Sequence, residues 1–241
     1  MRHLFISLIA ILAVSCSQTK MFQKSISSYN IPIEYLHDSK KTNVSAIDSI
    51  TIRLNNVPID SITTVSKLKG LVLPFIVFNY SEVNMSVKLG QSSIEKPYDD
   101  FFLTSFIEES KRTGRFGIAN QPKQDSTYTL DITIDTCSTL SKYRRSNTVI
   151  FLLFAYSMSF NEIGFPAETN LQVSTKLRKG DLVVAEKNYR ITKTQPFLQS
   201  RNVSIEKLRS DFTANMVESL SLCTKQCIED MIHDVNNSIR N

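Results

Sequence analysis

A stripe of apolar residues near the end of the 241-residue chain constrains the fold more than any other feature. Its members recur every three or four positions: Ile205, Leu208, Phe212, Met216, Leu220, Cys223, Cys227, Met231 and Val235. This spacing predicts one amphipathic helix over about residues 204–236, with Ser204 as its N-cap. At 1.5 Å per residue such a helix is about 50 Å long. We therefore expect either a break in it or an end that overhangs the domain and binds a partner.

Alternation of apolar and polar residues predicts strands ahead of this helix. The clearest example runs from Tyr128 to Ile134, and shorter ones cover residues 50–54 and 85–89. The apolar run 69–78 predicts a buried strand in which Pro74 lies at an edge, an end or a bulge. The first half of the chain is therefore expected to supply much of a sheet.

A second helix is predicted over residues 98–113, because Pro97 precedes a pattern of helical spacing and Gly114 follows it. Residues 171–191 alternate on both sides of Gly180, which predicts a β-hairpin. Together these elements predict an α+β fold. Its mixed or antiparallel sheet is packed by two helices, of which the C-terminal one is long.

The first sixteen residues carry a targeting signal. A short basic start leads into the apolar run 4–12, which has the length of a signal peptide and is too short to span a membrane. Residues 12–16, Leu-Ala-Val-Ser-Cys, resemble the lipobox of bacterial lipoproteins. This resemblance implies cleavage before Cys16 and attachment of lipid, such as palmitate, to Cys16. The alternative is an ordinary secretory signal followed by an incidental cysteine.

Three regions follow from this interpretation. Residues 1–15 form the lipoprotein signal peptide, residues 16–49 form a flexible tether rich in Ser, Lys, Asn and Gln, and residues 50–241 form a single α+β domain. The chain carries 28 Lys and Arg against 23 Asp and Glu. An excess this small, spread over the whole length, predicts no nucleic-acid groove.

No motif for catalysis, a cofactor or a metal stands out, so we expect a protein that is not an enzyme. His37 and His233 lack a second ligand at metal-binding spacing. Cys223 and Cys227 lie on one helical face and are best explained as small buried apolar residues. At most one internal disulfide is expected, from Cys137 to either of them, which leaves one thiol free.

The most apolar internal segment covers residues 148–160. It is shorter than the roughly 20 residues that a membrane-spanning helix needs. One interpretation is a buried hairpin or core segment, and the other is a surface that touches lipid or an apolar partner. In the second case the candidate contact residues are Phe151, Leu152, Phe154 and Tyr156.

One stretch of the chain resembles a known unit of envelope proteins. Leu73-Pro74-Phe75, the 101–113 helix, Gly114-Arg115-Phe116 and the 128–134 strand occur in that order. This order resembles the N-terminal α/β unit of the TolB N-terminal domain, the curli-secretion lipoprotein family and transport auxiliary lipoproteins. The resemblance covers about residues 50–137. It implies accessory or assembly work in the envelope rather than catalysis.

We therefore expect a non-enzymatic accessory or adaptor lipoprotein, bound to the membrane through Cys16 and to an envelope protein partner. The alternative is a carrier of lipid or of a small ligand, with the apolar segment lining its pocket. Ser17 occupies the place where an aspartate favours inner-membrane retention in enteric lipoproteins. The expected location is accordingly the outer membrane, facing the periplasm.

The lipid attachment can be tested directly. Replacing Cys16 with Ala removes the side chain that lipid attachment would require, so incorporation of labelled fatty acid into the protein in cells should be abolished. Labelling equal to that of the wild-type protein would contradict the lipoprotein interpretation.

Overall fold

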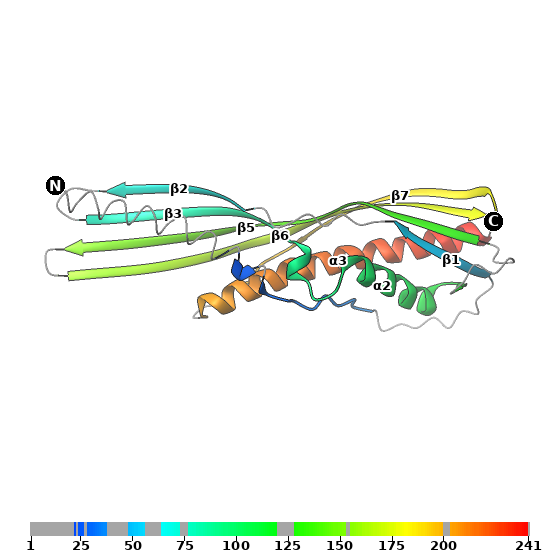
Figure 1. Cartoon of the computed structure of the whole chain (residues 1–241), viewed down its shortest axis with the longest axis horizontal. Coiled ribbons are helices and arrows are strands. Elements are labelled where there is room, and N and C mark those ends of the chain that lie inside the picture. The colour runs from blue at the N-terminus through cyan, green and yellow to red at the C-terminus, as the bar shows by residue number, and fades with distance from the viewer. Residues whose placement is uncertain are drawn as a thin grey trace.

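The computed structural model describes residues 22, 24–26, 28–37, 48–55, 64–72, 77–119, 128–152, 155–199 and 203–240. These residues form an elongated sheet with two helices on one side of it (Figure 1). The described strands make one seven-stranded sheet that contains both parallel and antiparallel pairs. The predicted α+β class, with a mixed sheet packed by two helices, is confirmed.

Two long strands form the centre of the sheet. β5 (Tyr128–Leu152) and β6 (Ala155–Lys179) have 25 residues each and pair antiparallel along their length. On the other side of β5, β1 (Asp48–Asn55) runs parallel to its beginning and β3 (Val77–Lys88) runs antiparallel to its end. The sequence predicted only the first seven residues of β5, where the alternation is clearest.

The outer strands differ between the two ends of the sheet. β4 (Phe116–Ile118) pairs with β1, and β7 (Leu182–Gln195) pairs with residues 167–179 of β6. At the opposite end β2 (Thr64–Val72) pairs with β3. The strand order is therefore β4-β1-β5-β6-β7 at one end of the molecule and β2-β3-β5-β6 at the other.

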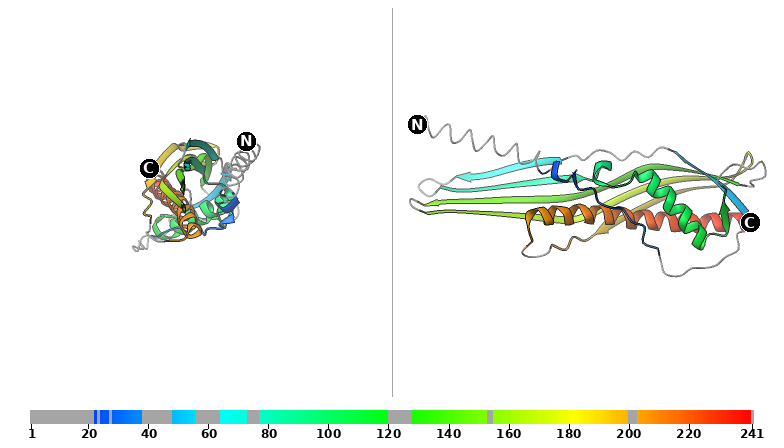
Figure 2. Two further views of the ribbon diagram at one scale, coloured as in Figure 1. Left: turned by 90° about the vertical axis from the view of Figure 1, so that its left-hand side faces the viewer. Right: turned by 60° about the horizontal axis from the view of Figure 1, so that its bottom comes forward.

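The two helices begin and end close to the predicted residues. α2 (Tyr98–Thr113) follows the short helix η1 (Gln91–Ser93), and α3 (Ile205–Arg240) closes the chain. The main-chain N–H of Lys207 donates to Oγ of Ser204 at 3.2 Å, which confirms the predicted N-cap. Both helices lie on the same side of the sheet (Figure 2, right).

The expectation that α3 breaks or overhangs the domain is wrong. α3 is a single helix of 36 residues, and its apolar stripe is buried from Leu208 to Val235. At about 1.5 Å per residue it measures roughly 54 Å, whereas β5 at about 3.3 Å per residue measures roughly 80 Å. It is the sheet that extends past the helix.

The prediction of one buried strand over residues 69–78 is also wrong. β2 ends at Val72 and β3 begins at Val77, and the two strands are antiparallel neighbours. The apolar run therefore supplies the ends of two strands. Pro74 itself lies outside the described residues.

Part of the expected tether packs against the domain. Phe22, Ile26 and Ile33 are each at most 5% exposed. Ile31 forms a parallel bridge with Ile94, and Oη of Tyr29 donates to the main-chain carbonyl of Glu206 at 3.2 Å. The apolar residues of this segment follow neither a helical nor a strand period, so their burial could not be predicted from the sequence.

The three described cysteines lie in the core as free thiols. Cys137, Cys223 and Cys227 are all buried, and none forms a disulfide. This agrees with the interpretation of Cys223 and Cys227 as small apolar residues. Burial raises the pKa of Cys137 and of Cys223 from an ordinary 9.0 to about 12 in each case.

These thiols make the fold sensitive to alkaline pH. The folded protein holds the thiol protons more tightly than the unfolded chain does. The contribution of the neutral thiols to the free energy of unfolding is therefore complete below pH 9.0 and is lost as pH rises toward about 12. The free energy of unfolding, measured with urea, should therefore fall steeply above pH 9.0. The Cys137→Ala/Cys223→Ala variant should fall less steeply. Equal slopes for the two proteins would contradict this assignment.

Candidate functional site

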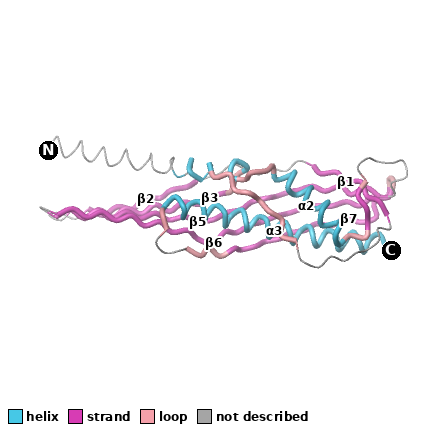
Figure 3. Tube along the Cα trace, turned by 90° about the horizontal axis from the view of Figure 1, so that it is seen from below, coloured by secondary structure: helices cyan, strands magenta, loops and turns pink. Residues whose placement is uncertain are grey.

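The most unusual feature of the molecule is a four-stranded extension of the sheet. We call it the arm and define it as residues 68–72 of β2, 77–83 of β3, 145–152 of β5 and 155–162 of β6. These segments continue past the beginning of α3, and the described helices end before the strands do (Figure 3). The arm therefore has a different environment from the rest of the sheet.

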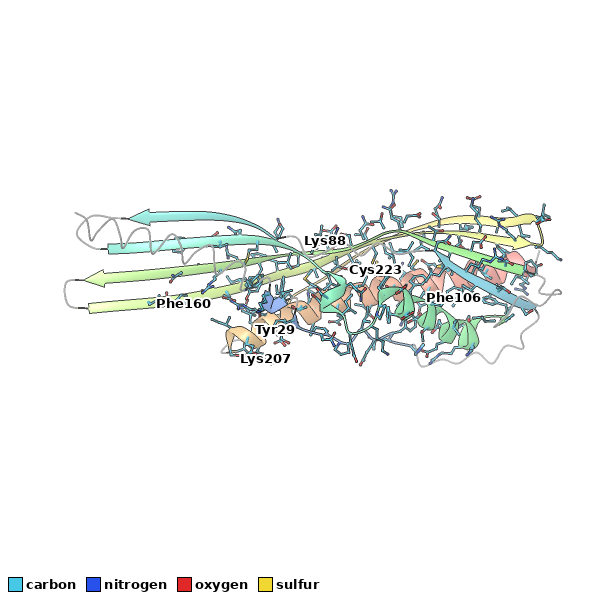
Figure 4. All side chains as sticks on the ribbon, viewed as in Figure 1. Tyr29, Lys88, Phe106, Phe160, Lys207 and Cys223 are labelled. Carbon is cyan, nitrogen blue, oxygen red and sulfur yellow. The ribbon has the colours of Figure 1, made fainter. Side chains whose placement is uncertain are left out.

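The exposure of residues along β6 shows where the helices stop packing against the sheet. Between Glu162 and Leu177, buried residues alternate with more exposed ones, as expected for a strand with one covered face. From Ser157 to Asn161 all five residues are exposed. Both faces of the strand are thus open there, and Met158 and Phe160 are each 44% exposed. Figure 4 shows Phe160 on the arm, beyond Lys207 in the first turn of α3.

A bulge marks the junction between the arm and the covered part of the sheet. Ser141 of β5 pairs with Ala167 of β6, whereas Tyr143 pairs with Gly164, so β6 carries one extra residue. Oγ of Ser141 donates to the main-chain carbonyl oxygens of the bulged residues Phe165 and Pro166, at 2.8 and 3.0 Å. Pairing with β7 ends at Ala167, the residue that follows Pro166 in the chain. Pro166 has no N–H to donate to a neighbouring strand.

A buried carboxylate joins the base of the arm to α3. The side chain of Glu162 is 1% exposed. Arg209 of α3 donates through Nε and Nη2 to its two oxygens, at 3.0 and 2.7 Å, and Oη of Tyr143 donates to it at 2.5 Å. Nε of Arg145 lies 3.5 Å from Oε1. Burial, followed by the hydrogen bond and the charge of Glu162, raises the pKa of Tyr143 far above its ordinary value.

Aromatic rings surround this group of charges. The ring of Phe22 lies 4.5 Å from that of Tyr143, and Tyr143 lies 5.0 Å from Phe212, both measured between centroids. The guanidinium of Arg209 lies over Phe22, 5.2 Å from its centroid. The N-terminal segment, β5 and α3 therefore meet at one point. We call Phe22, Tyr143, Glu162, Arg209 and Phe212 the arm root.

A second contact holds the N-terminal segment to α2. Nδ1 of His37 lies 2.9 Å from Oε2 of Glu109, and Nε2 lies 3.3 Å from Oε2 of Glu108. The two ring nitrogens face different carboxylates, so this contact fixes the end of the segment to the helix. Among the described side chains, no group of three or more His, Cys, Asp or Glu residues could hold a metal ion.

The structure brings together part of the contact surface expected from the sequence. In the register of β5 and β6, Phe151 lies opposite Tyr156 and Leu152 lies opposite Ala155, at the end of the arm. The side chains of Phe151, Leu152 and Tyr156 are not among those described. Cys16 and Phe154 lie outside the described residues altogether.

Sequence reasoning missed the contribution of β2 and β3 to this end of the molecule. Val77 pairs with Phe151 and Phe78 pairs with Ile150, so a second apolar hairpin lies beside the first. The signal that could have revealed it is the shared lack of charge in residues 70–81 and 146–161. The arm root could not have been found in this way, because its residues are far apart in the sequence.

Comparisons with known proteins identify no family for this chain. No family model matches it, and no curated protein does. Among solved structures, a Xanthomonas campestris protein described by the family model DUF330 is similar over 88% of this chain and 98% of its own, with 12% sequence identity and a TM-score of 0.44. These findings do not support a match to the TolB or curli-secretion families. In the described part of the chain, no helix is long and apolar enough to cross a membrane.

The arm root should contribute strongly to stability. Replacing Arg209 with Met leaves the carboxylate of Glu162 buried without its two-point partner, so we expect a loss of about 3–5 kcal/mol in the free energy of unfolding. Adding Glu162→Gln should restore part of that loss, because the uncompensated charge is then removed. Urea unfolding measures both effects.

Lys207→Met provides the matched control, since Lys207, two residues before Arg209 in α3, forms an exposed ion pair with Asp211. Loss of that pair should cost less than about 1 kcal/mol. Similar losses for Arg209→Met and Lys207→Met would show that the arm root is not a special contact.

Proposed function

We propose that this chain is a non-enzymatic accessory or adaptor lipoprotein of the bacterial envelope, which holds a partner at the membrane through the arm. The observation that carries the proposal is the arm itself. Its strand residues Ser157–Asn161 are exposed on both faces, although the segment contains Met158 and Phe160. Exposed apolar residues that cluster on a projecting element favour a contact surface over a structural role.

The N-terminal signal supports attachment of this surface to a membrane. If lipid is attached to Cys16, only six residue steps separate it from Phe22 in the arm root. A fully extended chain covers roughly 20 Å in six steps. The lipid anchor would therefore hold the base of the arm near the membrane surface. We propose the outer membrane, with the domain facing the periplasm.

Packing of residues 22–37 makes this attachment shorter than a free tether would be. Oγ of Ser221 donates to the main-chain carbonyl of Glu34, and Oη of Tyr29 donates to that of Glu206. Both contacts join the segment to α3. Residues 22–37 therefore do not add to the length of the tether, which suits a protein that positions a partner.

Site-specific crosslinking in intact cells tests this function. A photoreactive phenylalanine analogue at position 160 should form one discrete covalent adduct with an envelope protein, because Phe160 lies on the exposed arm. The same analogue at Val184, which is 39% exposed on β7, is the matched control and should not form that adduct. The adaptor function would be contradicted if position 160 gave no adduct beyond the level seen at position 184.

A further inference from the structure

The arm contains two stretches of chain that carry no charged residue. One covers residues 70–81 and the other covers residues 146–161, which are 12 and 16 residues long. In the structure their described parts are neighbouring strand ends: 70–72 of β2, 77–81 of β3, 146–152 of β5 and 155–161 of β6. Two uncharged stretches that are distant in the sequence thus form one end of the molecule, which we call the uncharged end.

The strand register aligns the boundary of the uncharged end across the sheet. Lys69 pairs with Glu82, and Glu82 pairs with Ser146. One residue further toward the helices, Arg145 pairs with Glu162. The nearest charged residues of the four strands therefore lie in a band across the arm: Lys67, Lys69, Glu82, Arg144, Arg145 and Glu162.

The charged band has a formal net charge of +2. It contains four cations and two carboxylates, and both carboxylates have partners within the protein. Glu82 accepts hydrogen bonds from Oη of Tyr80 at 2.6 Å and from Nδ2 of Asn84 at 2.8 Å, while Glu162 is bound by Arg209. A cationic band beside an uncharged, apolar end matches the order of layers at an anionic membrane, where headgroups precede the acyl chains.

We infer that the uncharged end of the arm contacts lipid, at the interface of a membrane that contains anionic phospholipids, with the charged band at the level of the headgroups. This inference rests on the proposed function, which takes the arm as the contact surface. It adds that the end of this surface touches lipid. The protein partner is then expected at the base of the uncharged end, where Phe160 lies two residues from Glu162 of the arm root.

The reach of the lipid anchor agrees with this placement. An acyl chain on Cys16 would hold Phe22 within roughly 20 Å of the membrane. The ring of Phe22 stacks on Tyr143, which directly precedes Arg144 and Arg145 of the charged band. The reach of the anchor therefore allows the charged band to meet the same membrane surface.

Hydrogen bonding limits the depth of this contact. Within the described sheet, β2 has β3 as its only neighbour and residues 155–166 of β6 have only β5, so each side of the arm keeps one unpaired strand edge. Main-chain groups on such an edge lose their water when they enter hydrocarbon, at a cost of several kcal/mol per group. A single chain therefore contacts the interface and does not cross the bilayer.

Flotation with vesicles tests the inference on the processed chain carrying Cys16→Ser, so that no acyl chain contributes. We expect binding to vesicles of equimolar phosphatidylglycerol and phosphatidylcholine, and weaker binding to phosphatidylcholine alone. Phe78→Asp/Ile150→Asp places charges on a register pair of the uncharged end and should weaken binding at least about tenfold. The matched control, Leu182→Asp/Val184→Asp, changes two exposed apolar residues of β7 and should bind like the parent protein.

A fluorescence measurement avoids dependence on how well the aspartate variant folds. Because the three described cysteines are buried, an environment-sensitive dye can be attached at Ser157→Cys on the arm or at Asn188→Cys on β7, both exposed positions. Anionic vesicles should shift the emission of the dye at position 157 to shorter wavelength and leave position 188 unchanged.

No flotation, or equal emission shifts at the two positions, would overturn the lipid contact. If crosslinking at Phe160 still captured one envelope protein, the adaptor function would stand without the lipid contact. Failure of both experiments would remove the adaptor function as well.

Discussion

The long ladder between β5 and β6 is the interaction on which the rest of the structure depends. Every other strand pairs either with one of these two strands or with a strand that does, and both helices pack on the side they define. Backbone pairing continues along 25 residues of each strand, whereas α3 covers only part of that length. The difference in rise per residue between strand and helix leaves one end of the sheet without a helix. The arm is the direct result.

The transition from covered sheet to arm is held by local features of different kinds. Pro166 and the bulge at residues 165–166 end the pairing with β7 and change the direction of β6. On the arm side of the bulge, Glu162 is the first buried residue after the exposed residues 157–161 of β6. Arg209, in the first turns of α3, donates hydrogen bonds to it. A buried ion pair is a weak source of net stability, but it strongly penalises any arrangement that separates its members. It therefore fixes the point at which the arm leaves the domain.

The fold class and both helices could be predicted because their signals are local. The alternation over residues 128–134, the stripe from Leu208 to Val235 and the N-cap Ser204 each depend on neighbours in the sequence. Three expectations differed from the structure because their outcome depends on distant residues. One of them, an overhanging end of α3, fails because the sheet is longer than the helix. The run 69–78 looks like one buried strand until β5 supplies a partner for β3, and residues 22–37 look like a tether although Phe22 and Ile26 are buried in the folded chain. The apolar segment 148–160 indicated one of the two stretches that form the uncharged end of the arm. That residues 70–81 lie beside it could be known only from the strand register.

Contacts between the two ends of the chain determine when folding can be completed. The hydrogen bond from Ser221 to Glu34 joins residues 187 positions apart, and Phe22 contacts Arg209 across a similar separation. Contacts this distant in sequence form late and slow the search for the native state. If the chain is exported from its N-terminus and held at Cys16, as we propose, its core is complete only after α3 has emerged. In that case its long apolar strands would be exposed beside the membrane until α3 packs, and rapid completion of export or protection by other envelope proteins would be needed.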